Sequence, residues 1–206
     1  MHYLVRSPWW LKMLFPRRIW TMPGNEKIIY LSFDDGPEPS VTPYVLDELA
    51  KYDAKATFFC IGKNCIQYPE VYDRILADGH ATGNHSFDHL NGWENNDAVY
   101  LDNVLKAKRS INSALFRPPY GRLKHKQQQL LLKEGFKIIM WSVLSGDFDE
   151  GISPEKCCEN VINKTRSGNI IVFHDSLKAY EKMIYALPLV LKHFTLKGYR
   201  FGKIVL

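Results

Sequence analysis

The chain has 206 residues, enough for one domain with a full hydrophobic core. Its content of 46% hydrophobic and 24% charged residues is ordinary for a folded globular domain, and no repeat, low-complexity tract or linker divides it. The formal net charge of +5 is mild, and without a basic run or a helix-turn-helix pattern it gives no reason to expect a nucleic-acid partner.

The first 25 residues are basic and aromatic. Trp9, Trp10 and Trp20 stand in short apolar runs that Pro8 and Pro16 interrupt. These runs are far shorter than the ~20 residues of a membrane-spanning helix, and they lack the order of a secretory signal. We expect residues 1–25 to form a strap packed across the domain of residues 26–206, with peripheral membrane contact as the alternative. Without a recognisable export signal, we expect a cytoplasmic or inner-membrane-associated protein.

From residue 27 onward, strand and helix patterns alternate. Apolar runs predict strands at 27–33, 56–61, 114–116, 137–143, 169–173 and 199–206, and a short, weak strand is predicted at 80–83. Helical spacing predicts helices at 41–49, 68–76, 96–111, 124–134, 153–166 and from 180 to a stop at Gly198. Seven such strands covered by amphipathic helices indicate an α/β fold with a parallel sheet buried on both faces. We expect a single-domain β/α barrel smaller than the eight-stranded type, with an open doubly wound sheet as the alternative.

Polar residues recur at one position in this pattern, directly after the predicted strands. They are Asp34 and Asp35 after the first strand, His85 and His89 after the third, Arg117 after the fourth, Asp147 after the fifth, and His174 and Asp175 after the sixth. Active sites of parallel β/α folds assemble from the loops at the carboxyl ends of the strands. The five groups therefore predict one site on one rim of the barrel.

The pair His85 and His89 indicates a metal site. Two imidazoles four residues apart face the same way on a turn, and the carboxylates of Asp34 and Asp35 end a neighbouring strand. Two histidines and one carboxylate are a known ligand set for zinc or another divalent first-row metal, with positions left open for water. Adjacent buried carboxylates repel each other, so we expect a metal beside one and a guanidinium, that of Arg117, beside the other.

His174 is the candidate general acid. It follows the buried run Ile170–Phe173, on the same rim as the proposed metal site. A carboxylate such as Asp147 would orient its imidazole and raise its proton affinity, as a general acid requires.

These motifs occur together in one family. Ser32-Phe33-Asp34-Asp35-Gly36-Pro37, His85-Ser86-Phe87-Asp88-His89, Arg117-Pro118-Pro119-Tyr120, the stretch 141–147 and Val172-Phe173-His174 stand in the order of the polysaccharide deacetylase family, also called the NodB-homology domain or carbohydrate esterase family 4. The resemblance begins near residue 27 and implies a distorted seven-stranded β/α barrel. It also implies that Asp35, His85 and His89 bind a divalent metal, usually zinc, with cobalt, nickel or manganese as alternatives.

The resemblance further implies a role for each catalytic residue. Asp34 resembles the general base that activates the metal-bound water, and Arg117 would orient and tune it. His174 resembles the general acid that protonates the leaving amine, with Asp147 as its partner. The backbone N–H of Tyr120, with the metal, would hold the oxyanion.

Three residues are expected to line the substrate pocket: Pro119, Phe148 and Val172. Two of them depart from the family pattern. Phe148 stands where relatives often have Trp, and Val172 stands where they commonly have Leu. The residue at position 172 lines the pocket for the acyl methyl group in relatives, so Val should make this pocket slightly roomier. Both changes bear on the substrate more than on activity.

We therefore expect a metal-dependent hydrolase, active as a monomer, that removes N-acetyl groups from the amino sugars of peptidoglycan or a related N-acetylglucosamine glycan. A deacylase of a lipid-linked amino sugar at the inner membrane is the first alternative. A carbohydrate-binding module on an inactive esterase fold is the second, but inactive relatives usually lose a metal ligand or the base, and this chain keeps both.

Overall fold

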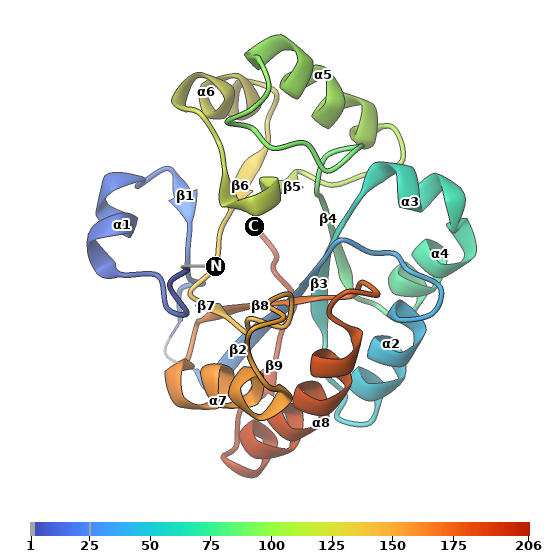
Figure 1. Cartoon of the computed structure of the whole chain (residues 1–206), viewed down its shortest axis with the longest axis vertical. Helices are drawn as coiled ribbons and strands as arrows, with labels where there is room; N and C mark the ends of the chain where they lie inside the picture. The colour runs from blue at the N-terminus through green and yellow to red at the C-terminus, as the bar shows by residue number, and fades with distance from the viewer. Residues whose placement is uncertain (1–2, 25) are drawn as a thin grey trace.

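A curled sheet of parallel strands runs through the computed structural model, which describes residues 3–24 and 26–206 (Figure 1). In this part of the chain the sheet has nine strands: β1 (Arg18–Ile19), β2 (Ile28–Asp34), β3 (Ala56–Cys60), β4 (Ala81–Asn84), β5 (Leu115–Phe116), β6 (Lys137–Ile139), β7 (Val143–Leu144), β8 (Ile170–His174) and β9 (Arg200–Phe201). The order is β1-β6-β5-β4-β3-β2-β8-β7, and β9 branches off by pairing with β2. All pairs are parallel, which confirms the predicted α/β class.

The predicted number of seven strands is wrong. Residues 18–19 add a strand and the predicted strand at 137–143 is divided, so the described residues form nine strands, of which eight lie on the main path and β9 branches off. The two halves of the divided strand lie towards opposite ends of the sheet, since β6 pairs with β1 and β5 while β7, an edge strand, pairs with β8. Residues 140–142 connect the two, with Met140 N–H donating to Ile19 O and Ser142 N–H donating to Ile170 O.

Helices surround the outside of the curled sheet (Figure 1). They are α1 (Trp9–Leu14), α2 (Thr42–Ala50), α3 (Gly62–Gln67), α4 (Pro69–Ala77), α5 (Asp97–Lys108), α6 (His125–Lys133), α7 (Pro154–Lys164) and α8 (Tyr180–Leu196), with a 3₁₀ turn, η1 (Pro119–Gly121). Side-chain caps mark two of the predicted starts: Asn96 accepts a hydrogen bond from Val99 N–H, and Ser153 accepts one from Lys156 N–H. Among the described residues, no helix has the length and apolar character needed to cross a membrane.

The two faces of β2 have different roles. Ile29, Leu31 and Phe33 pack into a core cluster that includes apolar residues of α2 and α8. Because side chains alternate along a strand, Ser32 and Asp34 lie on the other face, inside the curve of the sheet. The strand therefore fixes its own position through the outer face and carries a carboxylate to the rim on the inner one.

The N-terminal segment, residues 3–24, spans the opening between the edge strands. β1 pairs with β6, and Met22 N–H donates to Gly168 O just before β8. Closer to the start, Leu144 N–H donates to Val5 O, and Ser7 N–H donates to Ser142 O. The domain boundary at residue 25 stays a prediction, since residues 1, 2 and 25 lie outside the described part of the chain.

Candidate active site

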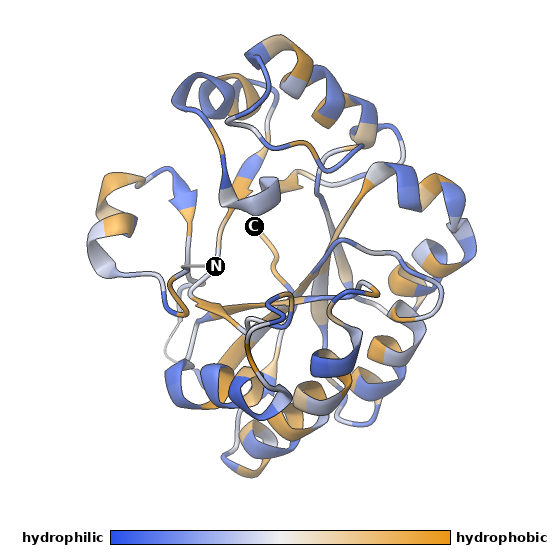
Figure 2. Cartoon of the chain, in the orientation of Figure 1, coloured by the Kyte–Doolittle hydropathy of each residue, from blue (hydrophilic) through white to orange (hydrophobic). Residues whose placement is uncertain are grey.

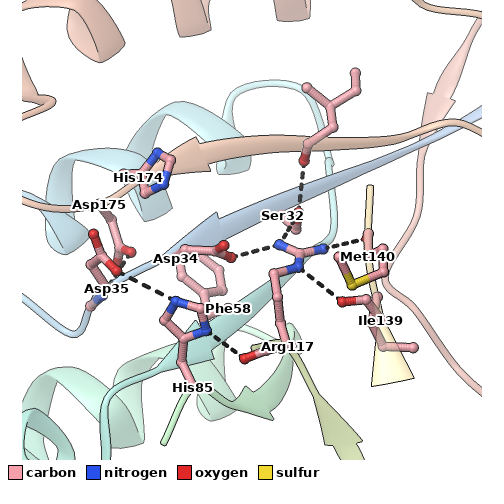
Figure 3. Close-up of polar contacts among 12 residues, drawn as sticks. Ser32, Asp34, Asp35, Phe58, His85, Arg117, Ile139, Met140, His174 and Asp175 are labelled. Atoms are coloured by element: carbon pink, nitrogen blue, oxygen red, sulfur yellow. Dashed lines mark hydrogen bonds and ion pairs between the residues drawn. The ribbon is translucent and has the colours of Figure 1, made fainter. Parts of the chain in front are cut away.

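The ends of β2, β4, β5 and β8 meet at one rim of the sheet, and the predicted site residues gather there (Figure 3). Asp34 ends β2 directly opposite His174, which ends β8. His85 follows β4, whose last residue pairs with Phe116 of β5, just before Arg117. The residues that follow these strands therefore lie together at one rim, as the order of the strands predicts.

Asp35, His85 and His89 lie close enough together to hold a metal ion, with their candidate ligand atoms within 4.8 Å of one another. Asp35 Oδ1 lies 3.6 Å from His85 Nε2 and 3.1 Å from His89 Nε2. This oxygen is buried, and it has no hydrogen-bond partner within the described residues. Asp35 and His89 adopt positive φ values of 82° and 56°, which is rare for non-glycine residues and typical of functional sites.

His85 is held as a neutral imidazole. Its Nδ1 lies 2.8 Å from the backbone carbonyl of Arg117 and donates to it in the tautomer that this contact selects. Burial lowers the pKa of His85 to about 4, so the ring carries no charge at neutral pH. Its Nε2 lone pair then faces the buried carboxylate of Asp35, an arrangement that a cation between them would stabilise.

Asp34 is held by a buried guanidinium. Arg117 Nη1 donates to Asp34 Oδ1 at 2.6 Å, and the Arg117 side chain has no solvent exposure. The guanidinium also donates to Ser32 Oγ at 2.7 Å, Met140 O at 3.1 Å and Ile139 O at 3.4 Å, and it lies 4.0 Å from the centre of the Phe59 ring. A buried cation fixed at so many points holds the carboxylate in one orientation.

Asp147 and His174 form the second charged pair of the rim. The two side chains meet at 2.8 Å between Asp147 Oδ1 and His174 Nδ1, and Asp147 Oδ2 accepts the backbone N–H of His174 at 2.7 Å. Burial alone would lower the pKa of His174, but the charge and hydrogen bond of Asp147 raise it to about 10. The imidazole is therefore protonated at neutral pH.

The remaining predicted residues lie around these groups. Tyr120 has a positive φ of 59°, and its ring centre lies 4.6 Å from that of His89. The ring centre of Phe148 lies 5.2 Å from that of His174, while Val172 is buried in β8 on the same face as His174. Pro119 is buried in η1. The oxyanion role of Tyr120 and the pocket roles of Pro119, Phe148 and Val172 stay predictions.

Asp175 is a site residue whose role was not predicted. Its Oδ1 accepts from Gly36 N–H at 3.1 Å, and its Oδ2 accepts from Thr42 Oγ1 at 2.6 Å. Burial raises the pKa of this carboxyl group to about 8. A Cβ at Gly36 would lie 2.0 Å from Asp175 Oδ2, so only glycine fits there. Asp175 thus positions the turn that carries Asp35, and its place directly after His174 was the available signal.

Two buried asparagines hold the loop that carries the histidines. Asn84 Oδ1 accepts from Ser86 N–H at 2.8 Å. Asn103, on α5, accepts from both Phe87 N–H at 2.8 Å and Asp88 N–H at 3.0 Å. Asn103 is a polar residue on the packed face of a helix, which indicates a hydrogen-bonding role. Its partners lie in a distant loop, so the sequence did not show which groups it would hold.

Known proteins share these features. A family model for polysaccharide deacetylase matches residues 21–139, more than half of the chain. A peptidoglycan-N-acetylglucosamine deacetylase of Bacillus cereus is 34% identical over 88% of this chain and 88% of that protein. A chitooligosaccharide deacetylase of Azorhizobium caulinodans is 35% identical over 73% of this chain and 75% of that protein.

The fold comparison agrees. The crystal structure of a peptidoglycan N-acetylglucosamine deacetylase, in complex with a naphthyl-substituted N-hydroxybenzamide, superposes with a TM-score of 0.88 at 29% identity, covering 96% of this chain and 95% of that one. The resemblance read from the motifs is confirmed: the chain belongs to the polysaccharide deacetylase family, and it is an enzyme of the hydrolase class, acting on amide bonds.

Proposed function

We propose that this enzyme removes N-acetyl groups from the N-acetylglucosamine units of peptidoglycan or a related glycan, using a divalent metal ion held by Asp35, His85 and His89. The observation that carries the proposal is the buried Asp35 Oδ1, which lacks a hydrogen-bond partner among the described residues and faces two imidazole nitrogens. The names of the relatives support the substrate class, since both peptidoglycan and chitooligosaccharide deacetylases match most of the chain.

The three side chains fit a metal ion in their chemistry. His85 is neutral, as a ligand must be, and its Nδ1 is engaged by a backbone carbonyl, as is usual for metal-binding histidines. A set of two imidazoles and one carboxylate suits zinc, with cobalt, nickel or manganese as alternatives. When bound, such an ion supplies a Lewis acid that lowers the pKa of water and polarises the amide carbonyl.

Asp34 acts in this proposal as the general base that takes a proton from the attacking water. Arg117 donates a hydrogen bond to its Oδ1, which holds the carboxylate in a single rotamer. Arg117 is a positioning residue, because it acts through Asp34. The backbone N–H of Tyr120 is the proposed donor to the oxyanion that forms on the amide carbonyl.

His174 acts as the general acid. Hydrolysis of an amide expels an amine, which leaves only when its nitrogen is protonated. His174 carries that proton at neutral pH, and Asp147 keeps the ring oriented with Nδ1 engaged and Nε2 available. Val172, Pro119 and Phe148 are the proposed walls for the acetyl group and the sugar.

Acetate release tests this assignment on three substrates: peptidoglycan fragments, chitooligosaccharides and a lipid-linked N-acetyl sugar. The Asp34→Asn variant should lose about 10²–10⁴-fold in turnover, since only proton transfer is removed. Asp53→Asn is the matched control, because Asp53 is exposed and precedes β3, at the opposite end of the parallel strands from the rim. Near wild-type release by Asp34→Asn, with an unchanged melting temperature, would show that Asp34 is not the base.

A deacylase of a lipid-linked amino sugar is a second candidate. It is favoured by the apolar side chains of α1, which remain exposed next to the rim of the site. In the same panel, faster release from the lipid-linked sugar than from the glycans would select this candidate.

A further inference from the structure

The N-terminal segment holds most of the excess positive charge of the protein. Residues 3–24 include four cationic side chains, Arg6, Lys12, Arg17 and Arg18, and no Asp or Glu. The formal net charge of the whole chain is +5. Arg18 is buried and donates to Gln128 Oε1 at 2.7 Å. The other three lie at the surface, wholly or in part.

Large apolar side chains stand next to these cations. On α1, the exposed fractions are 72% for Trp9, 51% for Trp10, 70% for Met13 and 65% for Leu14, and no residue of this helix is buried. We call these four residues the N-terminal patch. Figure 2 shows α1 as a largely apolar helix that stands apart from the helices around the sheet. Two tryptophans, a methionine and a leucine left uncovered together mark an interaction surface.

The patch is presented by a fixed scaffold. Leu11, Phe15 and Trp20 of the same segment pack against a core cluster of the domain. Trp20 Nε1 donates to Phe15 O at 3.3 Å, and the Arg18 guanidinium lies 4.1 Å from the centre of the Phe15 ring. One side of the segment is therefore anchored, as expected for a strap, while the N-terminal patch faces solvent.

The surrounding cations lack acidic partners. Among the described residues, Arg6, Lys12 and Arg17 form no ion pair. Burial and the positive charge of Arg6 lower the pKa of Lys12. Unpaired cations beside interfacial tryptophans complement a surface that is anionic above and apolar below.

We propose that the N-terminal patch docks onto an anionic lipid bilayer. The side chains of Trp9, Trp10, Met13 and Leu14 enter the boundary between headgroups and acyl chains, and the three cations meet the headgroups. A second copy of the chain fits less well, because a twofold contact would bring the same cations face to face. Four side chains on a six-residue helix are also few for a protein interface, which buries about 800 Å² per partner.

Docking would place the catalytic rim beside the bilayer. Leu11 and Phe15 line a cavity of about 290 Å³ together with Trp93, Tyr120 and Trp141. The ring of Tyr120 lies 4.6 Å from that of His89, so this cavity leads from the N-terminal segment to the site. This consequence rests on the proposed function; the docking itself does not, and it is measurable without activity.

Flotation of the full chain with vesicles tests the proposal. Wild-type protein should float with vesicles made of equal parts phosphatidylglycerol and phosphatidylcholine, and less with phosphatidylcholine alone. The double variant Trp9→Ser/Trp10→Ser should reduce the partition coefficient by roughly tenfold or more per side chain. Arg6→Glu/Arg17→Glu should reduce it by roughly fivefold or more per position and remove the dependence on phosphatidylglycerol.

A matched control lies on α8, at the exposed residues Lys192 and Leu196. Lys192→Glu/Leu196→Ser removes one cation and one apolar side chain elsewhere, and it should float like the wild type. All variants should keep the wild-type melting temperature and release acetate from soluble chitooligosaccharides at the wild-type rate. If that release is absent in every protein while flotation behaves as described, the proposed function fails and the docking stands.

Three outcomes would overturn the docking proposal. The wild type fails to float with anionic vesicles; the tryptophan variant floats as well as the wild type; or sedimentation velocity shows a dimer that the tryptophan variant abolishes, without any flotation. The last result would assign the N-terminal patch to a second copy of the chain.

Discussion

His85 and His174 lie on either side of Asp34 and Asp35, the first buried and the second partly buried, yet their charges at neutral pH differ (Figure 3). Burial acts on both in the same direction, by lowering the pKa of the imidazole. His85 meets a backbone carbonyl through Nδ1 and ends with a pKa of about 4. His174 meets the Asp147 carboxylate through Nδ1 and ends with a pKa of about 10.

The contrast shows that the partner of Nδ1 decides whether the effect of burial on the pKa of each ring is offset. A carbonyl offers a partial charge, which fails to offset desolvation, whereas a buried carboxylate offers a full charge at 2.8 Å. The half of the site around His85 is therefore suited to bind a cation, and the half around His174 is suited to donate a proton. Substitutions in the two halves should therefore change different measured properties.

The largest effect should come from removing a ligand in the neutral half. We expect His89→Ala to reduce acetate release to the level of a blank and to lower the zinc content per chain, measured by inductively coupled plasma mass spectrometry. Chelation of the wild type should have the same effect, and added zinc or cobalt should reverse it. His125→Ala is the control, since His125 is an exposed histidine on α6. Full activity in His89→Ala would refute the metal assignment.

The next largest effect on activity should come from removing the proton donor, His174, in the charged half. We expect His174→Ala to lower acetate release from an N-acetylated oligosaccharide by about 10²–10⁴-fold while the metal content stays at the wild-type level. Hydrolysis of 4-nitrophenyl acetate should fall far less, because nitrophenolate leaves without a proton. Equal losses on amide and ester would contradict the role of His174 as an acid.

A change to the partner of His174 should sharpen the comparison. His174 works in its protonated form, so activity should be lost as the pH rises through its pKa. Replacing Asp147 by Asn removes the charge that raises this pKa, and the alkaline limb of kcat should move down by about 1–3 pH units. Glu150→Gln, an exposed change in the same loop, should leave the limb in place. An unmoved limb in Asp147→Asn would assign the titration to another group.

The smallest effect on activity should come from a substitution of Tyr3, which contacts His174 through Phe148. The ring centre of Tyr3 lies 5.1 Å from that of Phe148, which in turn packs against the His174 ring. We expect Tyr3→Ala to lower kcat by about two- to tenfold with little change in KM, in line with one aromatic pair. Tyr3→Phe keeps the ring and should restore the wild-type kcat; failure of this rescue would point to the hydroxyl group instead.

The residues of the rim could be predicted from the sequence, because the order of strands and helices along the chain is enough to identify the residues that follow each strand. Asp34 and His174 follow strongly apolar runs, whereas His85 and Arg117 follow short, weaker ones, and parallel topology brings all four positions together. The positive φ values of Asp35, Ser86, His89 and Tyr120 were not predictable. Residues other than glycine adopt them only when surrounding contacts require it, and those contacts come from distant elements.

Two strands differ from the prediction. β1 has two residues and was not predicted, and β7 begins at the last residue of an apolar run that predicted a single strand. They exist because backbone partners in β6 and β8 accept them, which is a tertiary effect. The anchors Asp175 and Asn103 were missed for the same reason, since the backbone groups that they hold lie in other loops.

The crossing of the N-terminal segment between the two edges of the sheet sets an order of events during synthesis. Ile19 pairs with Ile139, and Met22 bonds to Gly168, so both residues have partners that are translated much later. At about 5–20 residues per second, the 120 residues between Ile19 and Ile139 take about 6–24 s to translate. During that interval the tryptophans of α1 are outside the ribosome while their own domain is unfinished. Until β6 and β8 are made, the segment that carries these tryptophans lacks the strands that hold it in the folded domain.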